Sequence, residues 1–227
     1  MPIKRQYFTL IASLPPLPRF DRAERLPITR ERLRERLRML DPEDAEVLER
    51  AVAFLAWQRH PAARTDREMV AYYVQLCEVV HQPVLREMFE FPINLRTIMA
   101  ALRRRFEGQP PPKPWEPWGA GHWVRHIERH WEYPDFKLAA IYPWIPKVRA
   151  HLEAGEALAL ERLAMNLRWD HLDRLAPATA FGFETVMAYL FKWDILQRWL
   201  VYDVSASRVR FEDLVNGVID AYGRIFD

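Results

Sequence analysis

Three histidines at intervals of four residues form the pattern in this sequence that could hold a metal ion. His122, His126 and His130 would share one face of a helix, and imidazole nitrogens are common metal ligands. However, no cysteine lies near them, and they lack the zinc-protease order of two histidines around a glutamate. We expect surface or half-buried histidines here. The alternative is a helical metal- or ligand-binding enzyme that uses the face formed by His122, His126 and His130.

Other arrangements that could do chemistry are incomplete. Glu78 and His81 form one Glu-x-x-His pair, but carboxylate-bridged di-iron bundles need that pair twice, with two further glutamates. The sequence contains no glycine-rich phosphate loop, nucleophile elbow or dinucleotide fingerprint. We therefore expect a protein that is not an enzyme and that needs no metal and no cofactor.

The charge balance argues against a nucleic-acid partner. The 227 residues include 33 basic and 31 acidic side chains, whereas domains that neutralise phosphates usually show a concentrated basic face. Arginines at alternate positions from Arg30 to Arg38 would divide between two flanks of a helix, because residues two apart lie about 200° around its axis. We favour a solvated face. An edge facing an acidic partner or anionic lipid is the alternative, supported by Arg103, Arg104 and Arg105.

Apolar runs in this sequence are too short to cross a bilayer. The run at positions 7–14 is far below the roughly 20 residues that a membrane-spanning helix needs. Prolines follow it at once, without a small-residue cleavage site, so we do not expect a secretory signal. Cys77 is the single cysteine, which excludes an internal disulfide and fits a reducing compartment. We therefore expect a cytoplasmic protein.

Composition and periodicity predict an all-α protein of about nine to eleven helices. Glycine is scarce, helix-forming residues are abundant, and 18 prolines punctuate many short elements. Residues 7–14 should form an extended arm or a first helical turn. The helices that we expect after it lie near 29–40, 41–60, 65–82, just before Pro92, 93–108, 121–132, 135–142, 146–176 with an interruption near Gly155, 182–203 and 214–222.

The helix expected near 182–203 should form the core of the protein. Large apolar side chains recur along it at helical three-and-four spacing. Residues 109–121 are rich in proline and tryptophan and cannot be regular helix, so we divide the chain into an N-terminal helical lobe (1–108), this connection (109–121) and a C-terminal helical lobe (122–227). Trp115 and Trp118 should be packed against the protein, because exposed indoles are costly apolar surface.

Two segments resemble the C-subunit family, also called the d-subunit family, of V/A-type rotary ATPases. Residues 90–108 carry Asn94-Leu95-Arg96 and Leu102-Arg103 and close at Gly108, much like that family's helix with an Asn-Leu-Lys start. Residues 183–192 contain Phe-Glu, Ala-Tyr-Leu and Lys and resemble its later helix. The start YFTLIASLPPLP, and Trp199 followed by residues 211–215, look closer still to uncharacterised bacterial proteins encoded beside V/A-type ATPase components.

This resemblance implies a helical bundle like that of the C-subunit family, with a coupling or assembly role. Members of that family join the membrane rotor ring to the central stalk on the cytoplasmic side and have no catalytic activity. The resemblance thus implies ring and central-stalk subunits as partners, a peripheral position at the inner membrane and a part in ion and proton transport. The sequence departs from the family in being shorter than its three-lobed members, in Arg96, where the family has lysine, and in Trp193-Asp194, where it has a glutamate-rich run.

Five matched residues are the candidates for protein binding under this resemblance: Asn94, Arg96, Glu184, Tyr189 and Lys192. A purely structural role competes with that hypothesis. Asn94 would then cap its helix, and Glu184 and Lys192 would form pairs within the chain.

Overall fold

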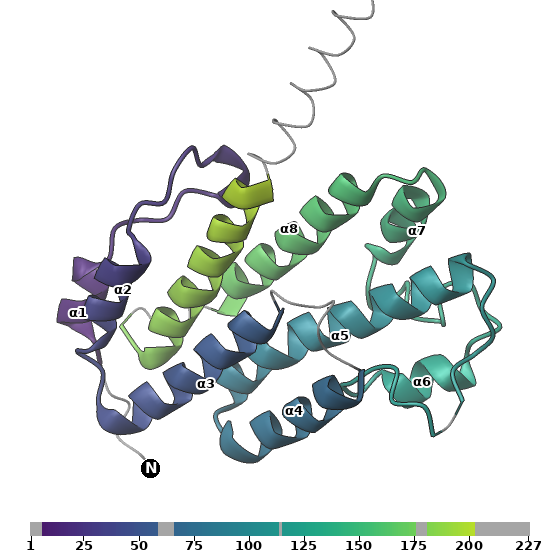
Figure 1. Cartoon of the computed structure of the whole chain (residues 1–227), viewed down its shortest axis with the longest axis horizontal. Helices are drawn as coiled ribbons and strands as arrows, with labels where there is room; N and C mark the ends of the chain where they lie inside the picture. Colours follow the sequence, from purple (N-terminus) through teal and green to yellow (C-terminus); the bar gives the residue numbers. More distant parts are fainter. Residues whose placement is uncertain (1–5, 59–65, 114, 176–180, 203–227) are drawn as a thin grey trace, which may run out of the picture.

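The described part of the chain is helical, as the composition predicts. The computed structural model describes residues 6–58, 66–113, 115–175 and 181–202. The helices are α1 (Phe8–Ser13), α2 (Arg30–Leu37), α3 (Pro42–Gln58), α4 (Asp66–Val79), α5 (Pro83–Phe106), α6 (Val124–Arg129), α7 (Ile145–Glu153) and α8 (Ala157–Leu175), with a 3-10 helix η1 (Phe20–Arg22). Residues 183–202 form a further helix, called here the 183–202 helix, which is yellow-green in Figure 1.

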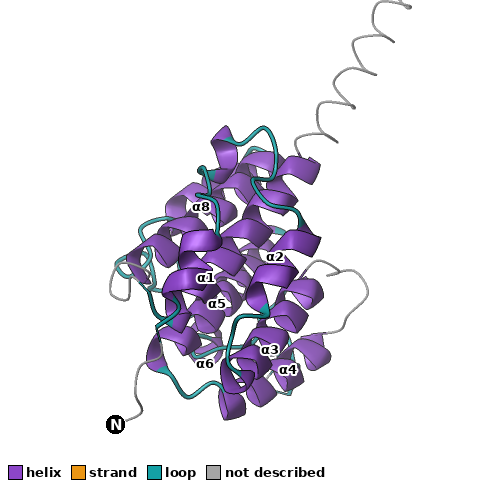
Figure 2. Ribbon diagram, turned by 90° about the vertical axis from the view of Figure 1, so that its left-hand side faces the viewer, coloured by secondary structure: helices purple, strands orange, loops and turns teal. Residues whose placement is uncertain are grey.

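These described elements confirm the predicted all-α class. Figure 2 shows helices and loops and no strand in the part of the chain that the structure describes. The β pairing found there is one isolated antiparallel bridge between Gln6 and Gly182. The helix expected near 214–222 and the capping residue Thr65 lie outside the described residues.

Buried apolar side chains form two clusters that meet along α5. The first is built from α1 to α4, the start of α5, the end of α8 and the 183–202 helix. The second is built from the rest of α5, residues 118–148 and the start of α8. Ile93 belongs to the first cluster and Leu95 to the second, and α5 also packs against α8. One long helix thus contributes to both clusters, and the division into two lobes at 109–121 stays a prediction.

Local signals place several helix ends correctly. Thr29 accepts a hydrogen bond from the backbone N–H of Arg32 and caps α2, as expected for a side-chain oxygen at this position. Gly155, with φ +69°, separates α7 from α8 at the predicted interruption. Residues 8–13 form the short helix α1, so the helical alternative is correct for this segment.

Pro92 does not end a helix, contrary to the prediction of two separate pieces around it. It lies inside the continuous helix α5. A proline there removes the hydrogen bond to the carbonyl of Met88 and costs about 3 kcal/mol. The flanking side chains Phe89 and Ile93 are almost fully buried, and their packing offsets that cost.

The helix predicted at 135–142 is replaced by turns. Phe136 and Lys137 have φ of 53° and 58°, which interrupts a right-handed helix. The carboxylate of Asp135 accepts hydrogen bonds from the backbone N–H groups of Lys137 and Ala139 and so competes with helical pairing. Phe136 itself is fully buried, which holds the turn in place.

Tryptophans of the 109–121 connection have opposite environments. Trp118 is buried and donates from its indole nitrogen to Glu128, at 3.0 Å. Trp115 is 78% exposed, so the prediction that it packs down is wrong. Lys113 lies over the ring of Trp115, 5.9 Å from its centroid, and this cation contact leaves the indole in solvent.

Candidate functional site

The three histidines lie at α6, and their ring nitrogens contact groups of the chain itself. His126 Nε2 is 2.9 Å from the carbonyl oxygen of Phe136, and His130 Nδ1 is 2.8 Å from that of His126, so each of these nitrogens donates a proton. His122 Nδ1 is 3.3 Å from Asn94 Nδ2. Each imidazole is thus oriented by one of these contacts.

The described structure gives no support to a metal site at these histidines. In the described ranges, no group of three or more His, Cys, Asp or Glu side chains could hold a metal ion. The rings of His126 and His130 lie 4.2 Å apart between centroids and are tilted by 31°, so they pack against each other.

Asn94 is a buried contact residue in the middle of α5. Because α5 begins at Pro83, the expectation that Asn94 caps a helix is wrong. Its side chain lies against Gly121, where any added Cβ atom would overlap Asn94 Oδ1, and Gly121 has φ +93°. The amide therefore fits a glycine on the far side of the proline-rich connection and fixes where that connection ends.

Two polar candidates on the 183–202 helix bind other parts of the chain. Tyr189 donates its hydroxyl to the carbonyl oxygen of Pro15, at 2.9 Å, and burial raises the pKa of this hydroxyl to about 12. Lys192 pairs with Asp173 of α8 at 2.5 Å, as the structural interpretation expected. Glu184 is buried in the same helix, at 6% exposure. Tyr189 and Lys192 therefore hold the 183–202 helix to its neighbours.

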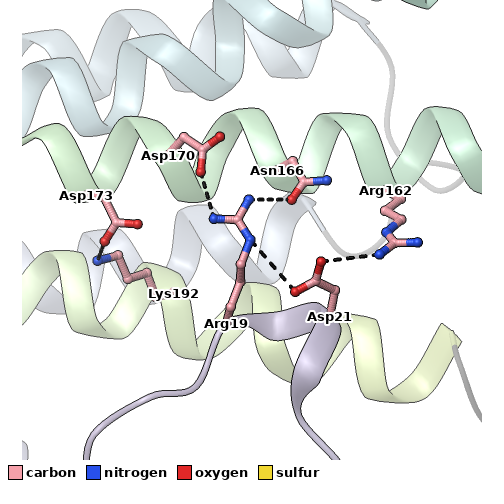
Figure 3. Close-up of polar contacts among 7 residues, drawn as sticks. All are labelled: Arg19, Asp21, Arg162, Asn166, Asp170, Asp173 and Lys192. Atoms are coloured by element: carbon pink, nitrogen blue, oxygen red, sulfur yellow. Dashed lines mark hydrogen bonds and ion pairs between the residues drawn. The ribbon is translucent and has the colours of Figure 1, made fainter.

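A polar network, shown in Figure 3, fastens the N-terminal segment to α8. Arg19 donates to Asp170 at 2.9 Å and to Asn166 at 2.6 Å, and it also pairs with Asp21. Asp21 in turn pairs with Arg162 at 3.2 Å. Arg162, Asn166 and Asp170 are spaced four apart on α8 and so lie on one side of this helix. That side supplies the partners on α8 for Arg19 and Asp21.

A pocket of about 430 Å³ contains Arg96, the remaining candidate, in its wall. Arg168 of α8 and Arg198 of the 183–202 helix line it as well. Each of these two guanidinium groups approaches Glu161, at 3.5 and 3.6 Å. Sequence reasoning missed Arg168 and Arg198, because each stands alone in its own segment. The candidate Arg96 and the triplet at 103–105 were the sequence signals in this region.

Comparison with known proteins gives a family but no activity. The family model described as "Protein of unknown function (DUF2764)" matches residues 48–221. The chain belongs to this family. No curated protein and no solved structure matches it. The DUF2764 match covers the pocket and the two segments at 90–108 and 183–192, so these features lie within the family-defining region.

No helix in the described part of this DUF2764 protein is long and apolar enough to cross a membrane.

Proposed function

We propose that this protein is a non-catalytic peripheral subunit or assembly factor of a bacterial V/A-type rotary ATPase. It couples the membrane rotor ring to the central stalk through contacts between proteins, and it works on the cytoplasmic side of the inner membrane. Its contact with the membrane is peripheral. Neither a cofactor nor nucleic acid takes part.

The observation that carries this proposal is that the start of the first segment resembling the C-subunit family packs against the second segment. Ile93 of the first segment and Phe183 and Leu190 of the second belong to the same hydrophobic cluster. Phe89, just before the first segment, meets Phe191 edge to face with ring centroids 5.4 Å apart. Segments that are distant in sequence but pack together are what a shared helical bundle requires.

The polar residues of the second segment support a mechanical role. Tyr189 and Lys192 bind Pro15 and Asp173 within the chain. Such contacts stiffen the body instead of serving a reaction. A protein that transmits force between a ring and a stalk needs this kind of rigidity.

Affinity capture of the tagged full-length chain from the native membrane fraction tests the proposal. We expect ring or central-stalk subunits of the rotary ATPase to co-purify, and a deletion strain to lose assembled or coupled ATPase. Failure to recover any of these subunits, together with an intact and coupled ATPase in the deletion strain, overturns the proposal.

Metal analysis of the purified protein tests the competing hypothesis of an enzyme at the histidine face. Stoichiometric zinc or iron that disappears in His126→Ala would favour that hypothesis. We expect no such metal, because the described residues contain no group of three or more His, Cys, Asp or Glu side chains that could hold one.

A further inference from the structure

Five arginines line the pocket between α5, α8 and the 183–202 helix. Helix α5 supplies Arg96, Arg103 and Arg104, α8 supplies Arg168, and the 183–202 helix supplies Arg198. Arg103 is exposed, so the pocket reaches solvent on that side. The volume of about 430 Å³ is within the range of small-molecule sites, roughly 300–1,000 Å³.

The inner end of the pocket holds two arginines and one shared carboxylate. Glu161 Oε1 is 3.5 Å from a terminal nitrogen of Arg168 and 3.6 Å from one of Arg198, and this oxygen makes no hydrogen bond within the described residues. The side chains of Arg168 and Arg198 are only 15% and 18% exposed. Burial first, and the charge of Arg198 second, lower the pKa of Arg168 to about 10. Two poorly solvated cations thus repel each other across one loosely held carboxylate.

The wall of the pocket holds five guanidinium groups and one carboxylate, that of Glu161. Two further acidic groups lie nearby: Glu116 pairs with Arg104 at 2.8 Å, and Asp194 is a buried carboxylate whose charge acts on Arg168. An anion with more than one negative charge would suit a wall this rich in guanidinium groups.

We propose that this pocket binds the phosphomonoester group of an organic molecule. A phosphomonoester carries close to two negative charges at neutral pH, and guanidinium groups bind phosphate through paired N–H donors. The volume exceeds that of a phosphate group alone, and Leu95, Met99 and Trp118 give the remaining wall an apolar part that would contact the organic body. Both a free phosphorylated metabolite and the headgroup of a phosphatidic acid carry this chemistry.

Titration calorimetry and vesicle co-sedimentation of the full-length chain test the proposal and separate the two sources. The soluble probe is adenosine 5′-monophosphate, with adenosine as its uncharged control. The lipid probe is a phosphatidylcholine vesicle containing phosphatidic acid, with pure phosphatidylcholine as control. Binding of the first probe indicates a free metabolite, and binding of the second alone indicates a lipid headgroup. Either result supports a phosphomonoester site.

Variants locate the binding. Arg198→Gln should weaken binding of the active probe at least tenfold, since each tenfold loss corresponds to 1.4 kcal/mol. Arg103→Gln, at an exposed position, should leave the fold intact and weaken binding about threefold, which corresponds to ~0.7 kcal/mol. Arg125→Gln, on the exposed face of α6, makes the same change in net charge outside the pocket and should have no effect.

The proposal is overturned if neither probe binds at millimolar concentration. It is equally overturned if Arg103→Gln weakens binding no more than Arg125→Gln does, because the attraction would then be a general charge effect. Because the experiment uses the purified chain alone, its outcome is independent of the rotary ATPase proposal.

Discussion

Two sides of α8 use the same residue types in opposite ways. On one side, Arg19 has close, well-oriented partners in Asn166 and Asp170, as Figure 3 shows. On the other, Arg168 and Arg198 approach Glu161 only at 3.5 and 3.6 Å. The first arrangement uses its charge to hold the N-terminal segment to the bundle. In the second, two guanidinium groups share one carboxylate oxygen that makes no hydrogen bond within the described residues, and this difference separates a structural network from a candidate binding site.

The largest expected effect comes from removing the shared carboxylate. Glu161→Gln should lower the free energy of unfolding by about 3 kcal/mol, because it leaves two poorly solvated guanidinium groups without this partner. Urea denaturation measures the change. Glu153→Gln, at a side chain 59% exposed in α7, is the matched control and should change stability by less than about 0.5 kcal/mol. Equal effects of the two substitutions would show that the pocket charges are already well compensated.

Acid sensitivity should come next, from His171 on the buried side of α8. Burial first, and the charge of Arg174 second, lower the pKa of His171 to about 4. The ring stacks on Phe91 with centroids 4.0 Å apart, and Glu87 approaches it at 3.9 Å.

As the pH falls, the imidazole of His171 takes up its proton in the unfolded chain before it does so in the folded protein. The stability that the neutral, buried imidazole contributes is therefore complete above about pH 6.5. That contribution is lost as the pH falls toward 4. Between pH 6.5 and 4 the free energy of unfolding of the native protein should therefore fall by about 2 kcal/mol more than that of His171→Gln. Urea denaturation at a series of pH values measures the difference. If the free energies of unfolding of the two proteins fell in parallel with pH, His171 would not be the source of the acid sensitivity.

Tyr189→Phe should weaken the attachment of the N-terminal segment by about 1 kcal/mol, the usual net value of one hydrogen bond. Burial raises the pKa of Tyr189 to about 12. The stability contributed by its neutral hydroxyl is therefore present below pH 10 and is lost as the pH rises from 10 toward 12. The native protein should thus lose more stability than the variant over that interval. Thermal unfolding at high pH checks this, and an unchanged difference between the two proteins would refute it.

The smallest change in stability is expected on the side of α8 that binds Arg19. Asp170→Asn should lower the free energy of unfolding by about 0.5 kcal/mol, since the pair with Arg19 is partly solvated and Asn166 still accepts a bond. Urea denaturation at low and high salt measures it, and the difference should shrink at high salt. A loss as large as that of Glu161→Gln would erase the distinction between the two sides.

Sequence alone determined the helical class and those helix ends that have a local cause. The Thr29 cap and the Gly155 break depend on one or two neighbouring residues, and both are found where expected. Apolar periodicity likewise identified the 183–202 helix as core, because Val186, Met187 and Leu196 are fully buried.

Tertiary structure decided what local preference could not. Pro92 stays within α5 because the burial of Phe89 and Ile93 outweighs a lost hydrogen bond, and that burial is supplied by other helices. The roles of Asn94, Tyr189 and Lys192 depend on partners far along the chain, namely the residues at 121, 15 and 173. The arginine pocket arises in the same way. Its charges come from three helices, so their mutual repulsion exists only once packing has brought those helices together and excluded the water that would screen it.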